Sequence, residues 1–100
     1  MDLDFKKVTV EDCDFILKIR NDDSTRHFLH NSQKFSSAQF KKWFVKEKPE
    51  WIKVIHRDVE VGYMRTVISY PDIEIGMDVC PTHRGKGYAK EAYQKLLKNL

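Results

Sequence analysis

The sequence predicts one α+β domain with the element order β-α-α-β-β-β-α. Three stretches of alternating or β-branched residues, 51–57, 59–68 and 73–80, follow one another, with turn signals at Asp58 and 70–72 between them. Amphipathic helical patterns precede and follow this group. Because consecutive strands joined by tight turns pair antiparallel, we expect a meander that is covered by helices.

The first part of the chain predicts a strand and a helix, followed by an irregular segment. Apolar residues alternate loosely over residues 3–10, which indicates a first strand. An apolar stripe over residues 11–20, which Thr9 or Glu11-Asp12 can cap, indicates a helix. Residues 21–35 are polar without a clean period, so they predict a loop or a short broken helix.

Two further helices are marked by their ends and by their apolar faces. Ser36 and Gln39 form a capping-box pattern, and Pro49 ends the helix that they start. The last helix spans residues 87–100 and places its lysines outside the apolar face. The apolar positions are Phe40, Trp43 and Phe44 in the first of these helices, and Ala89, Ala92, Tyr93, Leu96, Leu97 and Leu100 in the second. We expect Trp43 and Phe44 to be core residues.

The charge balance gives no reason to expect a nucleic-acid partner. The net charge of +3 arises from 18 Lys and Arg against 15 Asp and Glu, which suits a local site for an anionic small molecule. The lysines of the last helix leave a nucleic-acid module open as an alternative, but the solvated face of an amphipathic helix explains them more simply.

Cysteine and histidine usage indicates a reducing compartment and no metal. Cys13 and Cys80 lack CxxC spacing, which is typical of reduced thiols. His27 and His30 have ligand-like spacing, yet no further Cys, His or acidic cluster completes a zinc set. The sequence has no apolar run of signal-peptide or membrane-span type, so we expect a cytoplasmic protein with no membrane partner.

The stretch Arg84-Gly85-Lys86-Gly87-Tyr88-Ala89 lies between a predicted strand and a predicted helix. Its two glycines allow positive φ angles and a close approach to a ligand. Unpaired N–H groups and the positive dipole end of the following helix point to the same place, where Arg84 and Lys86 add positive charge. The stretch therefore predicts a phosphate or pyrophosphate site, with a structural turn as the alternative.

Residues 78–89, with the sequence DVCPTHRGKGYA, resemble the acetyl-CoA signature of the GNAT family of N-acetyltransferases. That signature is Arg or Gln, two residues, Gly, one residue, then Gly or Ala, and here Arg84, Gly87 and Ala89 fill it. The element order also resembles the first part of the family's fold. The resemblance implies a three-layer GNAT-like α+β fold, acetyl-CoA as acyl donor without a metal, and acetyl transfer to a primary amine.

The resemblance also assigns roles to the loop and to the strand before it. Backbone N–H groups of the loop would hold the pyrophosphate, and the edge of the strand would pair with pantetheine and supply an oxyanion donor. Glu74 is the candidate general base, with a solvent-facing carboxylate as the alternative. Asp78 is expected to pair with Arg84 or Lys86. The expected cofactor-binding residues are Met77, Asp78, Val79, Arg84, Gly85, Lys86, Gly87, Tyr88 and Ala89.

A narrower resemblance concerns the acceptor. Residues 19–22 and 42–44, with the polar residues between them, look like the branch that contains the ribosomal-protein N-terminal acetyltransferases and the amino-sugar-nucleotide N-acetyltransferases. This implies a small-molecule amine, such as an amino-sugar nucleotide, or the N-terminal amine of a protein. The expected acceptor-binding residues are Arg20, Asn21, Arg26 and Asn31, and the alternative is a surface loop with helix-end hydrogen bonds.

Members of the family usually continue after the motif helix with a β-α-β-β part, and the printed sequence ends within that helix. We therefore expect a single partial domain over residues 1–100 that holds one wall of the cofactor cleft. The alternatives are an incomplete fragment that binds acetyl-CoA without catalysis, and a homodimer formed through the exposed edge of the strand Ile73–Cys80.

Overall fold

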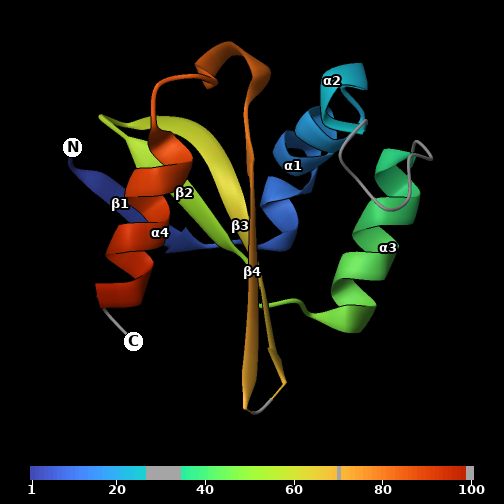
Figure 1. The fold of residues 1–100 in the computed structure, drawn as a ribbon. Helices are drawn as coiled ribbons and strands as arrows, with labels where there is room; N and C mark the ends of the chain where they lie inside the picture. Colours follow the sequence, from blue (N-terminus) through green and yellow to red (C-terminus); the bar gives the residue numbers. More distant parts are fainter. Residues whose placement is uncertain (27–34, 70, 99–100) are drawn as a thin grey trace.

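The computed structural model describes residues 1–26, 35–69 and 71–98 (Figure 1). The strands and main helices are β1 (Leu3–Lys7), α1 (Cys13–Arg20), α2 (Asp23–Arg26), α3 (Ser37–Glu47), β2 (Ile52–His56), β3 (Val59–Ser69), β4 (Asp72–Val79) and α4 (Tyr88–Lys98). Short 3-10 helices, Val10–Asp12 and Pro81–His83, precede α1 and α4. The predicted α+β class is confirmed, and α2 lies where a loop or short broken helix was expected.

The four strands form one antiparallel sheet in the order β1-β2-β3-β4. The turn between β2 and β3 contains Arg57 and Asp58, with φ of 52° and 64°. Positive φ at both central residues suits a tight hairpin whose twist matches that of the strands. The Asp58 turn and the meander were therefore correctly predicted from local signals.

The register of β3 and β4 decides which side chains share a face of the sheet. Cross-strand partners project to the same face, and every second pair lies on that face. The register pairs Tyr63 with Asp78, Arg65 with Gly76, and Val67 with Glu74. These three pairs therefore line one face of the sheet, with Asp78 at one end of the row and Glu74 at the other.

Helices cover the two faces of the sheet, and each face has its own hydrophobic core. Figure 1 shows α1, α2 and α3 on one side of the strands and α4 on the other. The core under α1 and α3 contains Val8, Cys13, Ile16, Leu17, Ile19, Phe40, Phe44, Trp51 and Tyr63. The core under α4 contains Leu3, Val54, Val61, Met64, Tyr88 and Ala92. Phe44 is buried, as expected from the sequence.

The first strand is shorter than the predicted 3–10. It ends at Lys7, and Val10 is 41% exposed in the 3-10 helix that follows. The backbone N–H of Thr9 donates to Asp12 Oδ2 at 2.9 Å, so the chain already turns into a helix N-terminus at this point. The alternation of apolar residues therefore extends beyond the strand itself. The strand stops at Lys7 because the chain turns into the helix cap at Thr9.

The capping box predicted for α3 is present. The backbone N–H of Ser36 donates to Gln39 Oε1 at 3.1 Å, and the backbone N–H of Gln39 donates to Ser36 Oγ at 3.2 Å. The helix ends at Glu47, and Lys48 follows in the left-handed region with φ of 47°. Two donors that would otherwise be unpaired are satisfied, which stabilises the start of this helix.

Leu100 lies outside the described residues; in the described part of the last helix, the predicted apolar face is wrong at Leu97 and the predicted polar face at Lys95. Leu97 is 60% exposed, whereas Ala92 is fully buried. Lys95, expected on the solvated face, lies with its Nζ 5.2 Å from the centre of the Phe5 ring and donates to the carbonyl oxygen of Leu3. β1 begins beside this part of α4, so the long stem of Lys95 covers apolar surface there.

Candidate functional site

The loop between β4 and α4 has the backbone conformation that its glycines predicted. Gly85 and Gly87 have φ of 78° and 81°, in the left-handed region that favours glycine. A Cβ atom added at either position would meet nothing within 4 Å, so space for a ligand is open beside the loop. α4 begins at Tyr88 and has 11 residues, and its first-turn N–H groups lie at this loop. The loop therefore fits a pyrophosphate group.

The side chain of Arg84 ties this loop to neighbouring elements. Its Nη1 and Nη2 donate to Ser24 Oγ at 2.6 Å and Thr25 Oγ1 at 2.5 Å, both in α2, and its Nε donates to the carbonyl oxygen of Val79 at 3.2 Å. Three of the five guanidinium N–H groups are thus engaged within the protein. Lys86, by contrast, is exposed. Binding of the cofactor by Arg84 and Lys86 stays a prediction.

Tyr88 points its side chain into the core beneath the loop. It is 8% exposed, and its hydroxyl lies 2.8 Å from Nδ1 of His56. The ring of His83 approaches that of Tyr88 edge-on, with 6.3 Å between the centres. The hydroxyl of Tyr88 is therefore occupied by protein, and a cofactor role for this residue stays a prediction.

β4 presents different side chains to the two faces of the sheet. Met77 and Val79 pack against the core under α4, so their backbone rather than their side chains lies at the strand edge. Glu74 is exposed on the opposite face, across from Val67. Among the described residues, no strand pairs with the outer edge of β4. The roles expected for Glu74, Met77 and Val79 stay predictions.

Asp78 lies at the centre of a buried polar cluster. Its Oδ2 accepts a hydrogen bond from the Tyr63 hydroxyl at 2.5 Å and lies 3.3 Å from Nε of Arg65 and 3.9 Å from Nη1 of Arg20. The side chain of Asp78 is only 10% exposed. Its expected pairing with Arg84 or Lys86 is wrong, because the sheet register directs the carboxylate toward α1 instead.

Tyr63 is the fully buried member of this cluster. Burial, and then the negative charge of Asp78, raise its pKa above the usual range of a phenol. The hydroxyl therefore stays protonated, accepts from Nη1 of Arg20 at 3.2 Å and donates to Asp78. Tyr63 and Arg65 were missed at the sequence level. Tyr63 and Arg65 are two positions apart, which places both on one face of β3 but is a weak signal of a site. Only the register with β4 shows that Asp78 lies on the same face.

The absence of a side chain at Gly76 makes room for Arg65. A Cβ atom at Gly76 would lie 2.7 Å from Nη2 and 3.1 Å from Cζ of Arg65. The guanidinium therefore lies against the backbone of β4, where its Nη2 donates to Asp78 Oδ1 at 3.4 Å. Any larger residue at position 76 would displace it.

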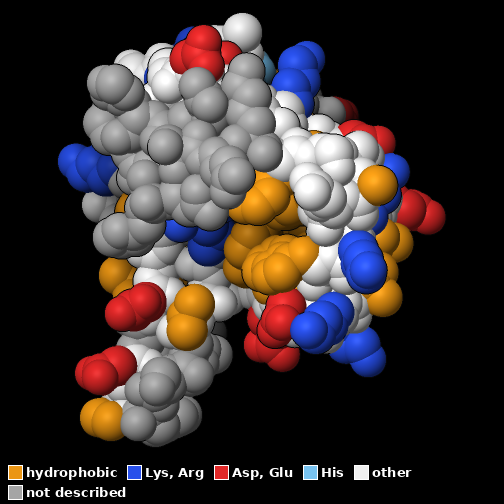
Figure 2. Space-filling model, turned by 90° about the vertical axis from the view of Figure 1, so that its right-hand side faces the viewer, with side chains coloured by type: hydrophobic (Ala, Val, Ile, Leu, Met, Phe, Trp, Pro, Cys, Tyr) orange, Lys and Arg blue, Asp and Glu red, His pale blue; other side chains and the backbone are white. Residues whose placement is uncertain are grey.

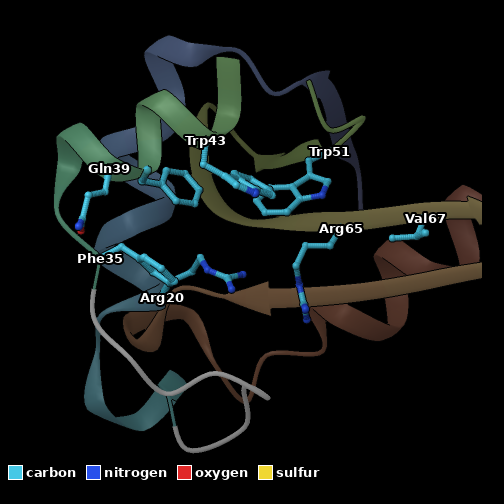
Figure 3. Close-up of a pocket in the computed structure, with 8 residues that line it drawn as sticks. Arg20, Phe35, Gln39, Trp43, Trp51, Arg65 and Val67 are labelled. Carbon is cyan, nitrogen blue, oxygen red and sulfur yellow. The ribbon is translucent and has the colours of Figure 1, made fainter. Parts of the chain in front are cut away.

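A pocket of about 540 Å³ opens on the same face of the sheet. Figure 2 shows hydrophobic side chains gathered around a hollow on this face. In Figure 3, Trp43 and Trp51 lie side by side on one side of the pocket, and Arg20 and Arg65 extend between these rings and β4. The lining residues are Arg20, Phe35, Gln39, Phe40, Trp43, Trp51, Arg65 and Val67. Trp43, expected in the core, is 40% exposed because it lines this pocket.

The four expected acceptor residues are placed differently. Arg20 lines the pocket. Asn21 uses its side-chain amide within the protein, donating to the carbonyl oxygen of Phe35 at 3.0 Å and accepting from its N–H at 3.3 Å. Arg26 is the last residue of α2, and Asn31 lies outside the described residues. The structure thus brings Arg20 together with Arg65, and an acceptor role for these side chains stays a prediction.

Residues 1–26, 35–69 and 71–98 contain neither a candidate metal cluster nor a membrane-spanning helix. No group of three or more His, Cys, Asp or Glu side chains there could hold a metal ion. Within the same ranges, no helix has the length and apolar character needed to cross a membrane.

The chain belongs to the GNAT acetyltransferases: the family model for the acetyltransferase (GNAT) domain matches residues 2–100. No curated protein sequence matches the chain. Two similar solved structures are a GNAT-family acetyltransferase from Bacillus anthracis (TM-score 0.81, 22% identity) and an acetyltransferase from Thermus thermophilus (TM-score 0.81, 16% identity). These likenesses show the fold.

The chain is shorter than these similar proteins. It is covered to 98% and 100% by the two matches, but it spans 61% and 70% of their lengths. A third similar structure is yncA, a putative acetyltransferase from Salmonella typhimurium with its cofactor acetyl-CoA (TM-score 0.70, 18% identity), of which the chain spans 61%. The chain thus corresponds to part of a GNAT domain.

Proposed function

We propose that the protein containing this chain transfers the acetyl group of acetyl-CoA to a primary amine. The observation that carries the proposal is the open loop at the start of α4, where Gly85 and Gly87 hold positive φ angles in a chain of the GNAT family. Structural neighbours that contain acetyl-CoA or coenzyme A support the same donor. The activities named for these neighbours are properties of those proteins, and they are not carried over to this chain.

Acetyl-CoA would be held by backbone groups. The N–H groups of residues 85–89 belong to the open loop and the first turn of α4, and they would donate to the pyrophosphate, with the exposed Lys86 adding positive charge. The edge of β4 at Met77–Val79 would pair with the pantetheine chain and present an N–H group to the thioester oxygen. When bound, acetyl-CoA supplies an activated acetyl group.

β4 places three carboxylates on the pocket face, Asp72, Glu74 and Asp78, and Asp72 lies at the end of the strand next to the turn from β3. The Asp78 carboxylate is already engaged within the protein by Tyr63, Arg20 and Arg65. Glu74 is exposed and lies across from Val67, which lines the pocket. Glu74 would therefore take the proton of the acceptor amine, directly or through a water molecule. The amino-sugar nucleotide and the protein N-terminus stay predictions for the acceptor.

Isothermal titration with acetyl-CoA tests the donor site. The chain should bind acetyl-CoA saturably, and a Gly87→Val variant should lose this binding because a β-branched residue disfavours the positive φ that the loop requires. Lys98→Gln, at the other end of α4, is the matched control and should bind as the wild type does. Unchanged binding by the Gly87→Val variant, or no binding by any of the three proteins, would reject the site.

A second candidate is an assembly in which two copies pair through β4. Among the described residues the outer edge of this strand has no partner, and unpaired edges favour strand addition. In a dimer, a second copy would cover this edge. Sedimentation velocity at increasing concentration tests the idea, because a constant monomer mass would exclude it while leaving the donor site unaffected.

A further inference from the structure

The aromatic wall of the pocket offers a surface for a flat or apolar group. The ring of Trp43 lies 5.6 Å from that of Trp51 and 5.7 Å from that of Phe40. Trp51 is itself stacked on the buried ring of Tyr63 at 5.5 Å, so the wall is anchored in the core. Because Trp43 remains 40% exposed, this rigid surface is available to a ligand ring or a large apolar side chain.

The opposite side of the pocket carries an excess of positive charge. Arg20 and Arg65 share a single carboxylate, Asp78, which leaves one net positive charge in this cluster. In the part of the chain that the structure describes, Nη2 of Arg20 and Nη1 of Arg65 have no hydrogen-bond acceptor. The planar guanidinium groups are suited to bind a carboxylate with two parallel hydrogen bonds. The pocket therefore favours a ligand with an anionic group as well as an apolar one.

The position of Arg65 limits the distance between the anionic group of a bound acceptor and the amine of the same acceptor. Its guanidinium lies against Gly76, the residue before the Met77–Val79 edge that is proposed to hold the thioester. A negative charge bound by Arg65 would thus lie beside the proposed point of acetyl transfer. In an amino-sugar nucleotide the phosphates are several bonds from the amine, and a protein N-terminus has no carboxylate on the carbon that bears its amine. An α-amino acid carries both groups on one carbon.

We propose that the acceptor is a free α-amino acid with an aromatic or large apolar side chain. This inference rests on the proposed acetyltransferase function. The carboxylate of the amino acid would bind Arg65 and Arg20, its side chain would pack on Trp43 and Trp51, and its ammonium group would lie toward the carboxylates of β4. The ammonium group loses one proton to Glu74, the resulting amine forms the C–N bond with the acetyl carbon, and the C–S bond of acetyl-CoA breaks with its electron pair on sulfur. One of the two remaining N–H protons passes to the thiolate, and the amide product keeps the other.

Tryptophan fluorescence reads this pocket directly, because both tryptophans of the chain line it. The purified chain is titrated with L-phenylalanine, with phenethylamine, which lacks the carboxylate, with L-alanine, which lacks the ring, and with uridine diphosphate. L-Phenylalanine should change the emission saturably, and each of the other three should bind at least tenfold more weakly. Equal or tighter binding of phenethylamine, L-alanine or uridine diphosphate would overturn the inference.

Variants separate the two halves of the pocket. Arg65→Gln should weaken L-phenylalanine binding by about 10- to 100-fold, the loss expected for hydrogen bonds to a charged group, and leave phenethylamine unchanged. Trp43→Ala should weaken both probes, and the exposed Lys46→Gln on α3 should weaken neither. If Arg65→Gln does not fold by circular dichroism, Arg65→Lys keeps the charge and loses the planar fork. Loss of phenethylamine binding together with L-phenylalanine in the Arg65 variant would count against a carboxylate contact.

The outcome is distinguishable from failure of the proposed function. If acetyl-CoA binds and L-phenylalanine does not, the acceptor class is wrong and the acetyltransferase proposal stands. If L-phenylalanine binds and acetyl-CoA does not, the donor site is wrong and the pocket is an amino-acid site of another kind. A discontinuous assay for N-acetyl-L-phenylalanine then tests the two together, with phenethylamine as the competing acceptor.

Discussion

Replacing Asp78 with Asn tests whether the polar cluster is held together by charge. The amide has nearly the same shape as the carboxylate and can still accept the hydrogen bond from Tyr63, but it removes the carboxylate that, among the described residues, pairs with Arg20 and Arg65. Breaking a fully buried ion pair costs about 3–5 kcal/mol. The arginine side chains here are 17% and 34% exposed, so water solvates them in part. We expect the free energy of unfolding to fall by about 2 kcal/mol.

Urea denaturation followed by tryptophan fluorescence measures this change, and thermal unfolding should show a midpoint lower by about 10 °C for a chain of this size. Asp14→Asn is the matched control, because Asp14 pairs with Lys41 on the surface, where its side chain is 67% exposed. The control should have no measurable effect. Equal effects of the two substitutions would refute the view that Asp78 neutralises two partly buried arginines.

Three further predictions follow from other contacts. Gly76→Ala should lower the free energy of unfolding by about 1–3 kcal/mol in urea, because its Cβ would lie 2.7 Å from Nη2 of Arg65; an unchanged midpoint would mean that the guanidinium moves away freely. Ser36→Ala should cost about 1 kcal/mol in the same assay by removing the cap of α3, unless Gln39 alone keeps the helix start in place. Burial alone would raise the pKa of Asp12, but the hydrogen bonds from Lys53 at 2.6 Å and from Thr9, together with the charge of Lys53, outweigh it, and the net pKa is lowered from 3.8. The stability that this carboxylate contributes should therefore be present above about pH 4 and be lost as the pH falls through its lower folded pKa; in pH-dependent urea titrations Lys53→Gln should lose less stability over that interval than the wild type.

Much of the fold could be predicted because the signals are local. The capping box of Ser36 and Gln39 and the tight turn at Asp58 each depend on residues that are neighbours in sequence. The exact ends of β1 and the exposure of Leu97 could not be predicted in this way. They depend on where a neighbouring element starts or stops, and apolar alternation carries no information about that.

The two halves of the candidate site differ in the same respect. The loop between β4 and α4 could be predicted from the sequence, because positive φ at Gly85 and Gly87 and the start of α4 are properties of one short segment. The pocket was not visible. It combines Arg20 from α1, Trp43 from α3 and Arg65 from β3, and nothing in the local sequence of any of these elements refers to the others.

The sequence by itself determined the antiparallel meander, the helix caps and the glycine loop with its acetyl-CoA resemblance, since short-range backbone conformation and hydrogen bonding fix each of them. Only the tertiary structure decided the partners of Asp78, the tether of Arg84 to α2 and the aromatic pocket. Arg20 and Tyr63 are 43 positions apart, and Arg84 and Ser24 are 60 apart. Such pairs meet only after the β3–β4 register and the packing of α1 on the sheet have placed them, because side-chain contacts over this separation depend on the whole fold.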